Sequence, residues 1–227
     1  MPAKNSIKQY KQNSYYHIYN RGVEKRNIFL DNQDLSVFLS YLKTYLEPKD
    51  EINLRLILNS TDSARSEKEK ASKELHLKNF SKEIELLCYA LMPNHFHLLI
   101  KQHELNSMDS FLNSLATRYV IYFNKKYKRV GPLFQGVYKA VLVNNEEQLL
   151  HLTRYIHLNP TKVGDNTWPS SLAEYLGTKK TPWIETSFIL NYFNEKSPKN
   201  DYYSFLNEGA EENQISAMSE TLIDTDD

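Results

Sequence analysis

Residues 84–100 of the chain read IELLCYALMPNHFHLLI, and this stretch decides the fold. Two apolar runs, Ile84 to Leu91 and Phe96 to Ile100, lie on either side of Met92-Pro93-Asn94-His95. A Pro-Asn pair between two apolar runs is typical of a tight turn. The stretch therefore predicts two antiparallel strands joined as a hairpin.

Strand and helix patterns alternate around this hairpin. Aromatic and β-branched residues favour further strands, whereas apolar residues that recur every three or four positions favour amphipathic helices. Residues 59–82 are rich in Ser, Lys and Glu and predict a loop or a short solvated helix. The predicted strands are 15–21 and 137–143, and the predicted helices are 34–46, 108–127 and 144–158, the last ending at Asn159-Pro160. This order predicts an α+β fold, an antiparallel sheet with helices packed on one face and a small C-terminal extension.

The composition indicates a globular protein with one main domain. The chain has 227 residues, 41% of them hydrophobic, which suffices for one core. It has no run of eighteen apolar residues and no apolar stretch near its N-terminus that could form the core of a signal peptide, so we expect a cytoplasmic location. The single cysteine, Cys88, excludes an internal disulfide and a cysteine-rich zinc site.

Charge is unevenly distributed along the chain. Residues 208–227 contain seven acidic residues and no Lys or Arg. Because the whole chain has 28 basic and 28 acidic residues, residues 1–207 carry a net charge of +7. A basic body suits a nucleic-acid partner, and the acidic end is either a disordered solubilising tail or a DNA mimic that screens the body.

Two pairs of residues have the spacing of a phosphoryl-transfer site. His95 and His97 are two apart on a predicted strand, so both side chains project from one face while Phe96 points into the core. Tyr155 and Asn159 are four apart on a predicted helix and are therefore neighbours. Two imidazoles and an amide oxygen leave open positions that suit Mg²⁺ or Mn²⁺. The alternatives are histidines that only form hydrogen bonds and a tyrosine that only packs.

Basic and aromatic residues are interleaved between the two pairs, as in proteins that bind single-stranded DNA. The predicted DNA-binding residues are Arg118, Lys125, Lys126, Lys128, Arg129, Tyr138 and Lys139. The alternative is a solvated helix face. Lys139 precedes the Tyr155 helix and is the residue we expect nearest to the phosphate.

Four blocks of sequence resemble the single-tyrosine HUH transposases, in particular the REP-associated and insertion-sequence-200-like transposases. They are residues 15–22 (YYHIYNRG), 92–97 (MPNHFH), 131–139 (GPLFQGVYK) and 154–160 (RYIHLNP). The resemblance implies a ferredoxin-like fold over residues 9–178, with 179–207 packed on it as an appendage and 208–227 as an acidic tail. It also implies His95 and His97 as metal ligands, Tyr155 as nucleophile, and Asn159 as third ligand where other branches of the family place glutamine. Tyr119 and Tyr122 are the rival nucleophiles, whereas His157 faces away from Tyr155.

The resemblance thus predicts a DNA transposase that nicks single-stranded hairpin or repeat ends through a 5′-phosphotyrosine and rejoins strands with a divalent ion. One alternative is a non-catalytic nucleic-acid-binding regulator. Another is a metal-dependent hydrolase that uses water as nucleophile. Nothing in the sequence decides between a monomer and a homodimer.

Overall fold

The computed structural model describes residues 8–162, 168–193 and 196–208. Four antiparallel strands form one sheet in the order β2-β3-β1-β4. The strands are β1 (Ser14–Arg21), β2 (Ile84–Met92), β3 (His95–Gln102) and β4 (Lys139–Leu142). With helix α1 (Asn32–Leu46) after β1 and helix α4 (Ser107–Lys126) after β3, this order defines a ferredoxin-like α+β fold. The predicted fold class and the predicted hairpin are confirmed.

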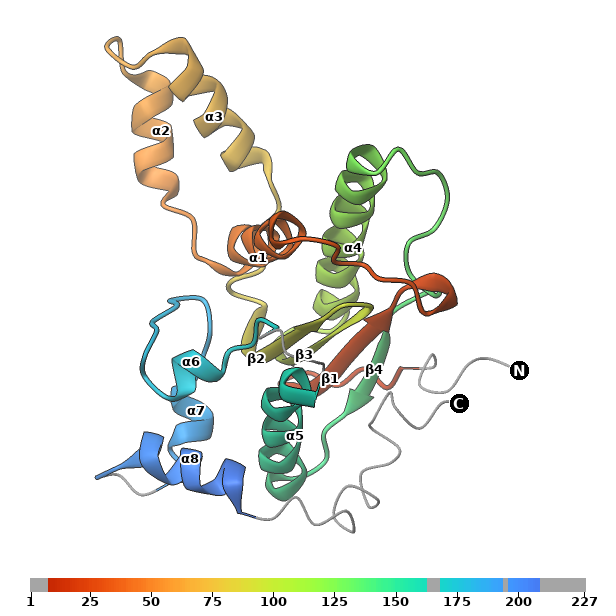
Figure 1. Ribbon diagram of the computed structural model, residues 1–227. Helices are drawn as coiled ribbons and strands as arrows, with labels where there is room; N and C mark the ends of the chain where they lie inside the picture. The colour runs from red at the N-terminus through yellow and green to blue at the C-terminus, as the bar shows by residue number, and fades with distance from the viewer. Residues whose placement is uncertain (1–7, 163–167, 194–195, 209–227) are drawn as a thin grey trace.

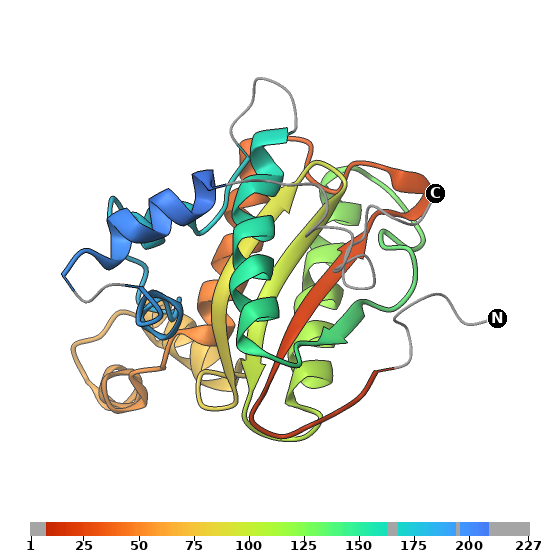
Figure 2. The same cartoon turned by 90° about the horizontal axis from the view of Figure 1, so that it is seen from below.

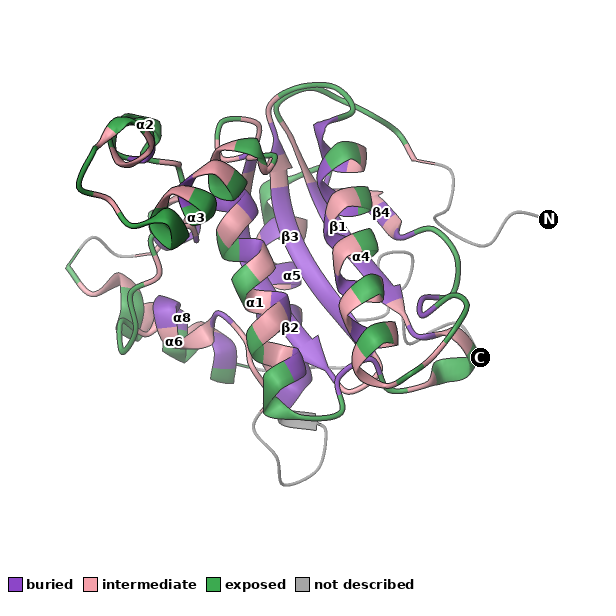
Figure 3. Ribbon diagram, turned by 90° about the horizontal axis from the view of Figure 1, so that it is seen from above, coloured by how far each residue is buried: buried purple, intermediate pink, exposed green. Residues whose placement is uncertain are grey.

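Helices cover both faces of the sheet, so the prediction that they pack on one face is wrong. Helices α1 and α4 bury one side of the sheet in a core that includes Phe38 and Phe111 (Figure 3). Helix α5 (Glu146–Leu158) covers the other side of the sheet (Figure 2). Its Leu152 and Ile156 belong to the same core cluster as Leu99 of β3. The physical reason is that β2 is buried over almost its whole length, and a strand that is apolar on both faces needs a layer on each.

A pair of helices stands between α1 and β2, and the second of them lies within residues 59–82, where the sequence predicted a loop or a short solvated helix. Helix α2 (Glu51–Asn59) begins at Asp50, whose side chain accepts a hydrogen bond from Asn53 N at 3.0 Å. Helix α3 (Arg65–His76) is the predicted solvated helix, whereas α2 was not predicted. The two helices bury Leu54 and Ala71 and project away from the sheet as a separate arm (Figure 1).

The C-terminal elements pack beside α5. The short helices α6 (Leu172–Tyr175) and α7 (Ser187–Leu190) precede α8 (Pro198–Asn207), and all three lie on the α5 side of the sheet (Figure 1). The buried side chains Tyr202 and Leu206 join the core beneath α5. Apart from Glu208, the predicted acidic tail lies outside the described residues. Among the described residues, none of the helices is sufficiently long and apolar to span a membrane.

Candidate active site

The two histidines lie on β3, a central strand of the sheet, and point toward α5. Alternation along the strand places Phe96 in the core on the α1 and α4 side, with His95 and His97 on the opposite face. Their ring centroids are 5.0 Å apart, and both residues are buried. The predicted common face is confirmed.

A third histidine supports the pair from the neighbouring strand. His17 of β1 places Nε2 2.8 Å from Nδ1 of His97, and the two rings stack with centroids 5.0 Å apart. Burial, with smaller contributions from the charges of His95, His17 and Arg21, lowers the pKa of His97 well below its ordinary value. His97 is therefore neutral at physiological pH, which is the form that ligates metals.

Helix α5 delivers Tyr155 and Asn159 to the same place. The Tyr155 ring stands edge-on to the His97 ring, with centroids 5.6 Å apart. Asn159 caps the helix, and its backbone N–H donates to the Tyr155 carbonyl. Its side-chain Nδ2 lies 3.3 Å from Nε2 of His97. The structure thus brings together all four residues that the sequence proposed.

The donor set fits a divalent ion. His95 Nδ1 lies 2.6 Å from Asn94 Oδ1, and His97 Nδ1 lies against His17, so each ring is oriented through Nδ1 and can direct the Nε2 lone pair inward. Half a turn of the Asn159 carboxamide exchanges Nδ2 for Oδ1, which is the donor that a hard cation needs. Within residues 8–162, 168–193 and 196–208, no three His, Cys, Asp or Glu side chains gather closely enough to hold an ion, so a metal here depends on the asparagine.

Lys139 lies in the same row of the sheet as His97. Tyr19 of β1 pairs with His97 of β3 on one side and with Lys139 of β4 on the other. Directly paired residues share a face, so Lys139 faces the α5 side, as the histidines do. Its Nζ lies 5.7 Å from the centroid of the Tyr19 ring. The role of Lys139 at the phosphate stays a prediction.

The other predicted DNA-binding residues are not gathered with Lys139. Helix α4 covers the opposite face of the sheet, so Arg118, Lys125 and Lys126 are separated from the histidines by the sheet itself. The guanidinium of Arg118 lies 4.0 Å from the centroid of the Tyr41 ring. Lys125 and Lys128 are exposed, Arg129 donates to Asn124, and Tyr138 is buried. Their roles in DNA binding stay predictions.

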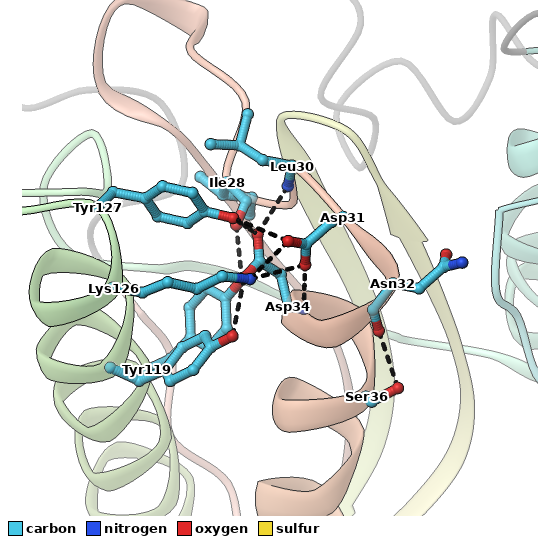
Figure 4. A network of polar contacts seen from close by, with 10 residues as sticks. Ile28, Leu30, Asp31, Asn32, Asp34, Ser36, Tyr119, Lys126 and Tyr127 are labelled. Atoms are coloured by element: carbon cyan, nitrogen blue, oxygen red, sulfur yellow. Dashed lines mark hydrogen bonds and ion pairs between the residues drawn. The ribbon is translucent and has the colours of Figure 1, made fainter.

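Lys126 takes part in a polar network that ties α4 to the start of α1 (Figure 4). Its ammonium lies 2.7 Å from Asp31 and 2.8 Å from the fully buried Asp34. Asp34 also accepts hydrogen bonds from the hydroxyls of Tyr122 at 2.9 Å and Tyr127 at 2.8 Å. These carboxylates balance the positive charge of Lys126, and the contacts join the two helices.

The rival tyrosines lie on the α1 and α4 side of the sheet. Tyr119 is buried and donates to the Ile28 carbonyl at 2.6 Å, while Tyr122 donates to Asp34. His157 is buried behind α5, with its two ring nitrogens 2.6 Å from the Tyr202 hydroxyl and 2.8 Å from the Ser171 hydroxyl. Of the candidate nucleophiles Tyr119, Tyr122 and Tyr155, only Tyr155 contacts the histidines.

The sequence reasoning missed His17. It lies within the aromatic run YYHIYNR, which was used only to predict a strand. Its contact with His97 depends on the register between β1 and β3, which pairs His17 with Leu99. A third histidine on a strand with the same alternation was the one available signal.

Part of the chain is similar to a known protein family. Residues 61–159 match the family model described as "Transposase IS200 like". The matched segment contains His95, His97, Tyr155 and Asn159. Over these residues the chain is similar to the IS200-like transposases.

One solved structure that is similar to this chain is described as "Structure of the REP associates tyrosine transposase bound to a REP hairpin". The two chains are 12% identical, and the similarity covers 79% of this chain and 95% of that chain with a TM-score of 0.46. No curated protein sequence matches this chain.

Proposed function

We propose that the protein is a metal-dependent single-strand DNA endonuclease and strand-transferase whose nucleophile is Tyr155. The observation that carries the proposal is the edge-on contact between Tyr155 and His97, with ring centroids 5.6 Å apart. This contact places a phenol beside two imidazoles and an amide, an arrangement that suits metal-assisted phosphoryl transfer. The match of residues 61–159 to the IS200-like transposase model supports it.

In the proposed reaction, the Tyr155 hydroxyl oxygen attacks the scissile phosphorus. The new bond joins tyrosine to the 5′ phosphate, and the bond between phosphorus and the 3′ oxygen breaks. The phenolic proton leaves the tyrosine, and the departing 3′ oxygen takes up a proton to become a 3′-OH. Rejoining reverses these steps with the 3′-OH of another strand, so the energy of the phosphodiester is kept and no ATP is needed.

Each side chain of the site has a defined task in this proposal. A bound Mg²⁺ or Mn²⁺, held by His95, His97 and Asn159, would polarise the phosphate. His17 orients the ring of His97 through Nδ1. Lys139, on the same face of the sheet, supplies positive charge for the phosphate oxygens. Helix α5 holds Tyr155 and Asn159 in register because they are one turn apart.

The proposed substrate is single-stranded DNA with a hairpin or repeat end. The alternative is a non-catalytic nucleic-acid-binding regulator derived from a transposase. The regulator has no need of a tyrosine held against a neutral histidine, so the geometry favours the enzyme. A hydrolase that uses water is the third candidate, and only the covalent adduct separates it from the first.

The test is covalent trapping. Wild type and Tyr155→Phe are incubated with labelled single-stranded hairpin oligonucleotides and Mg²⁺ or Mn²⁺, then separated on a denaturing gel. We expect an adduct with wild type that disappears in Tyr155→Phe and after chelation of the metal. Tyr119→Phe and Tyr122→Phe are the matched controls and should retain the adduct. Cleavage without any adduct would favour the hydrolase, and DNA binding without cleavage would favour the regulator.

A further inference from the structure

A cavity of about 290 Å³ lies on the face of the sheet opposite the histidines. It is bounded by α4 and by the segment that contains Phe134 and Tyr138, both of which are buried. This segment belongs to residues 131–139, one of the four blocks that resemble the transposases. Apart from Lys139 at its end, the candidate active site uses none of this block.

Aromatic rings and one buried amide line the cavity. Phe96 and Phe134 meet edge to face, with centroids 5.9 Å apart, and Tyr138 forms another part of the wall. Asn20 of β1 is 5% exposed and donates to the Gly136 carbonyl across 3.4 Å, a long hydrogen bond. The exposed Asn113 is a second polar residue of the lining. Mostly apolar walls with a few placed polar groups are typical of a site for a small ligand.

The Asn20 amide has capacity to bind an occupant. Its Oδ1 accepts from Arg21 N at 2.9 Å, and its Nδ2 donates to Gly136. A carboxamide can donate two hydrogen bonds and accept two. Among the contacts of the described residues, one donor and one acceptor position of Asn20 are therefore left for a ligand.

The Tyr138 wall is held in place before any ligand binds. Its hydroxyl donates to Asp109, which also accepts from the Tyr10 hydroxyl at 2.6 Å and from Lys8 Nζ at 3.0 Å. Lys8 Nζ lies 3.6 Å from the centroid of the Tyr138 ring. A preorganised ring reduces the entropy that is lost when a ligand stacks on it.

The cavity is open at Gly136 and close to the candidate active site. A Cβ on Gly136 would meet no atom within 4 Å, and the neighbouring Val137 is 62% exposed although it is apolar. Asn20 pairs with Phe96, the residue between His95 and His97, so the cavity lies behind the strand that carries the histidines. Tyr138 directly precedes Lys139, which faces the histidines. One single-stranded DNA that passes the end of the sheet can reach both the cavity and the candidate active site.

We propose that this cavity binds one unpaired base of the single-stranded DNA whose phosphate lies at Tyr155. The inference rests on the proposed function, because it takes single-stranded DNA as the substrate. Aromatic walls accept the face of any base. The donor and acceptor of Asn20 complement the N6 and N7 edge of adenine, so adenine is the expected base.

The experiment measures DNA binding in the Tyr155→Phe background, which removes the chemistry. A series of hairpin oligonucleotides carries a single abasic site at each position of the single-stranded flank in turn. Ala116→Trp fills the cavity from α4, and Thr117→Trp adds the same side chain at an exposed position as the matched control. Asn20→Leu removes the amide and keeps the volume. Thermal unfolding of each variant checks that it folds.

We expect one abasic position to weaken binding by about tenfold, within the range measured for loss of one stacked base. Ala116→Trp should weaken binding of the intact oligonucleotide by the same factor. Removal of the base at the sensitive position should then weaken binding to Ala116→Trp no further. Asn20→Leu should lose the preference for adenine there, and Thr117→Trp should behave like the parent.

The proposal is overturned if no abasic position matters, or if Ala116→Trp and Thr117→Trp give the same profile. If Ala116→Trp does not fold, Asn20→Leu provides the test. An unchanged base preference in Asn20→Leu would then overturn the proposal. If wild type forms no covalent adduct but one abasic position still weakens binding, the proposed nuclease function is wrong and the proposed base-binding cavity is supported. Absence of all DNA binding overturns both.

Discussion

His17 Nε2 lies 2.8 Å from His97 Nδ1, so the ring that faces Tyr155 is oriented by a histidine of the neighbouring strand. A hydrogen bond through Nδ1 selects the tautomer that presents Nε2 to a metal. The two residues are 80 positions apart in the chain. The geometry of the candidate site therefore depends on a cross-strand contact as well as on its own motif.

His17→Gln is expected to raise the Mn²⁺ concentration needed for half-maximal adduct formation by roughly 10- to 100-fold, because second-shell partners of ligating histidines contribute about this much to metal affinity. The measurement is a metal titration of the trapping reaction. The matched control is His76→Gln on the exposed end of α3, which should leave the titration unchanged. An unaltered metal requirement in His17→Gln would show that the contact has only a structural role.

Asn159→Ala is expected to abolish metal-dependent adduct formation while DNA binding persists, because the amide supplies the only proposed oxygen donor of the site. Asn159→Gln keeps that donor on a longer side chain and should retain part of the activity. Isothermal titration with Mn²⁺ gives a readout independent of cleavage. Equal Mn²⁺ binding by wild type and Asn159→Ala would remove the asparagine from the ligand set.

Lys139→Ala is expected to slow adduct formation by about tenfold or more, because the ammonium lies on the histidine face and would stabilise charge on the phosphate. Lys43→Ala is the matched control, because Lys43 is an exposed residue of α1 on the other side of the sheet. Single-turnover rates at saturating DNA separate chemistry from binding. A normal rate in Lys139→Ala would show that Lys139 does not contribute to the chemical step.

Asp34→Ala is expected to lower the free energy of unfolding by about 2–3 kcal/mol, because it removes a buried hydrogen-bond acceptor, although Lys126 keeps its ion pair with Asp31. The carboxylate also accepts hydrogen bonds from Leu30 N, Tyr122 and Tyr127, which lose their partner. Asp62→Ala, at an exposed position before α3, is the control. Urea unfolding measures both. A loss no larger than that of Asp62→Ala would mean that water replaces the carboxylate.

The stability of the protein is expected to fall in acid partly through His157. Burial lowers the pKa of His157 from its ordinary 6.5 to about 3. Below pH 6.5, His157 therefore binds a proton in the unfolded chain but stays neutral in the folded chain. The contribution of the neutral ring is complete above pH 6.5 and is lost as the pH falls toward 3, by up to about 1.4 kcal/mol for each pH unit.

His157→Gln should accordingly show a shallower dependence of unfolding free energy on pH between 6.5 and 4 than wild type. Other buried histidines such as His97 contribute to both proteins, so the difference between the two slopes isolates His157. Denaturant unfolding at several pH values provides the measurement. Parallel slopes would mean that the ring is protonated in the folded state.

Much of the local structure follows from residue order. A strand alternates with a period of two, so His95 and His97 had to share a face with Phe96 on the other. A helix turns every 3.6 residues, so Tyr155 and Asn159 had to be neighbours. The seven-element order predicted an α+β fold with antiparallel pairing, and the resemblance to the transposases implied its ferredoxin-like arrangement. Helix α2 was missed although five of its nine residues are apolar, because Ile52, Leu54 and Leu56 alternate with polar residues and this short pattern does not distinguish a helix from a strand.

Only the tertiary structure decided which layer covers which face. The sequence showed that Leu152 and Ile156 of α5 are apolar, but not that they belong to the same core cluster as Leu99, opposite α1 and α4. Pairing between strands far apart in the chain set His17 against His97, and packing of α4 on α1 turned Lys126 toward Asp34. Local periodicity determines how a side chain points from its own element. Which neighbour it meets depends on the register and stacking of whole elements, which are set by burial of the complete core.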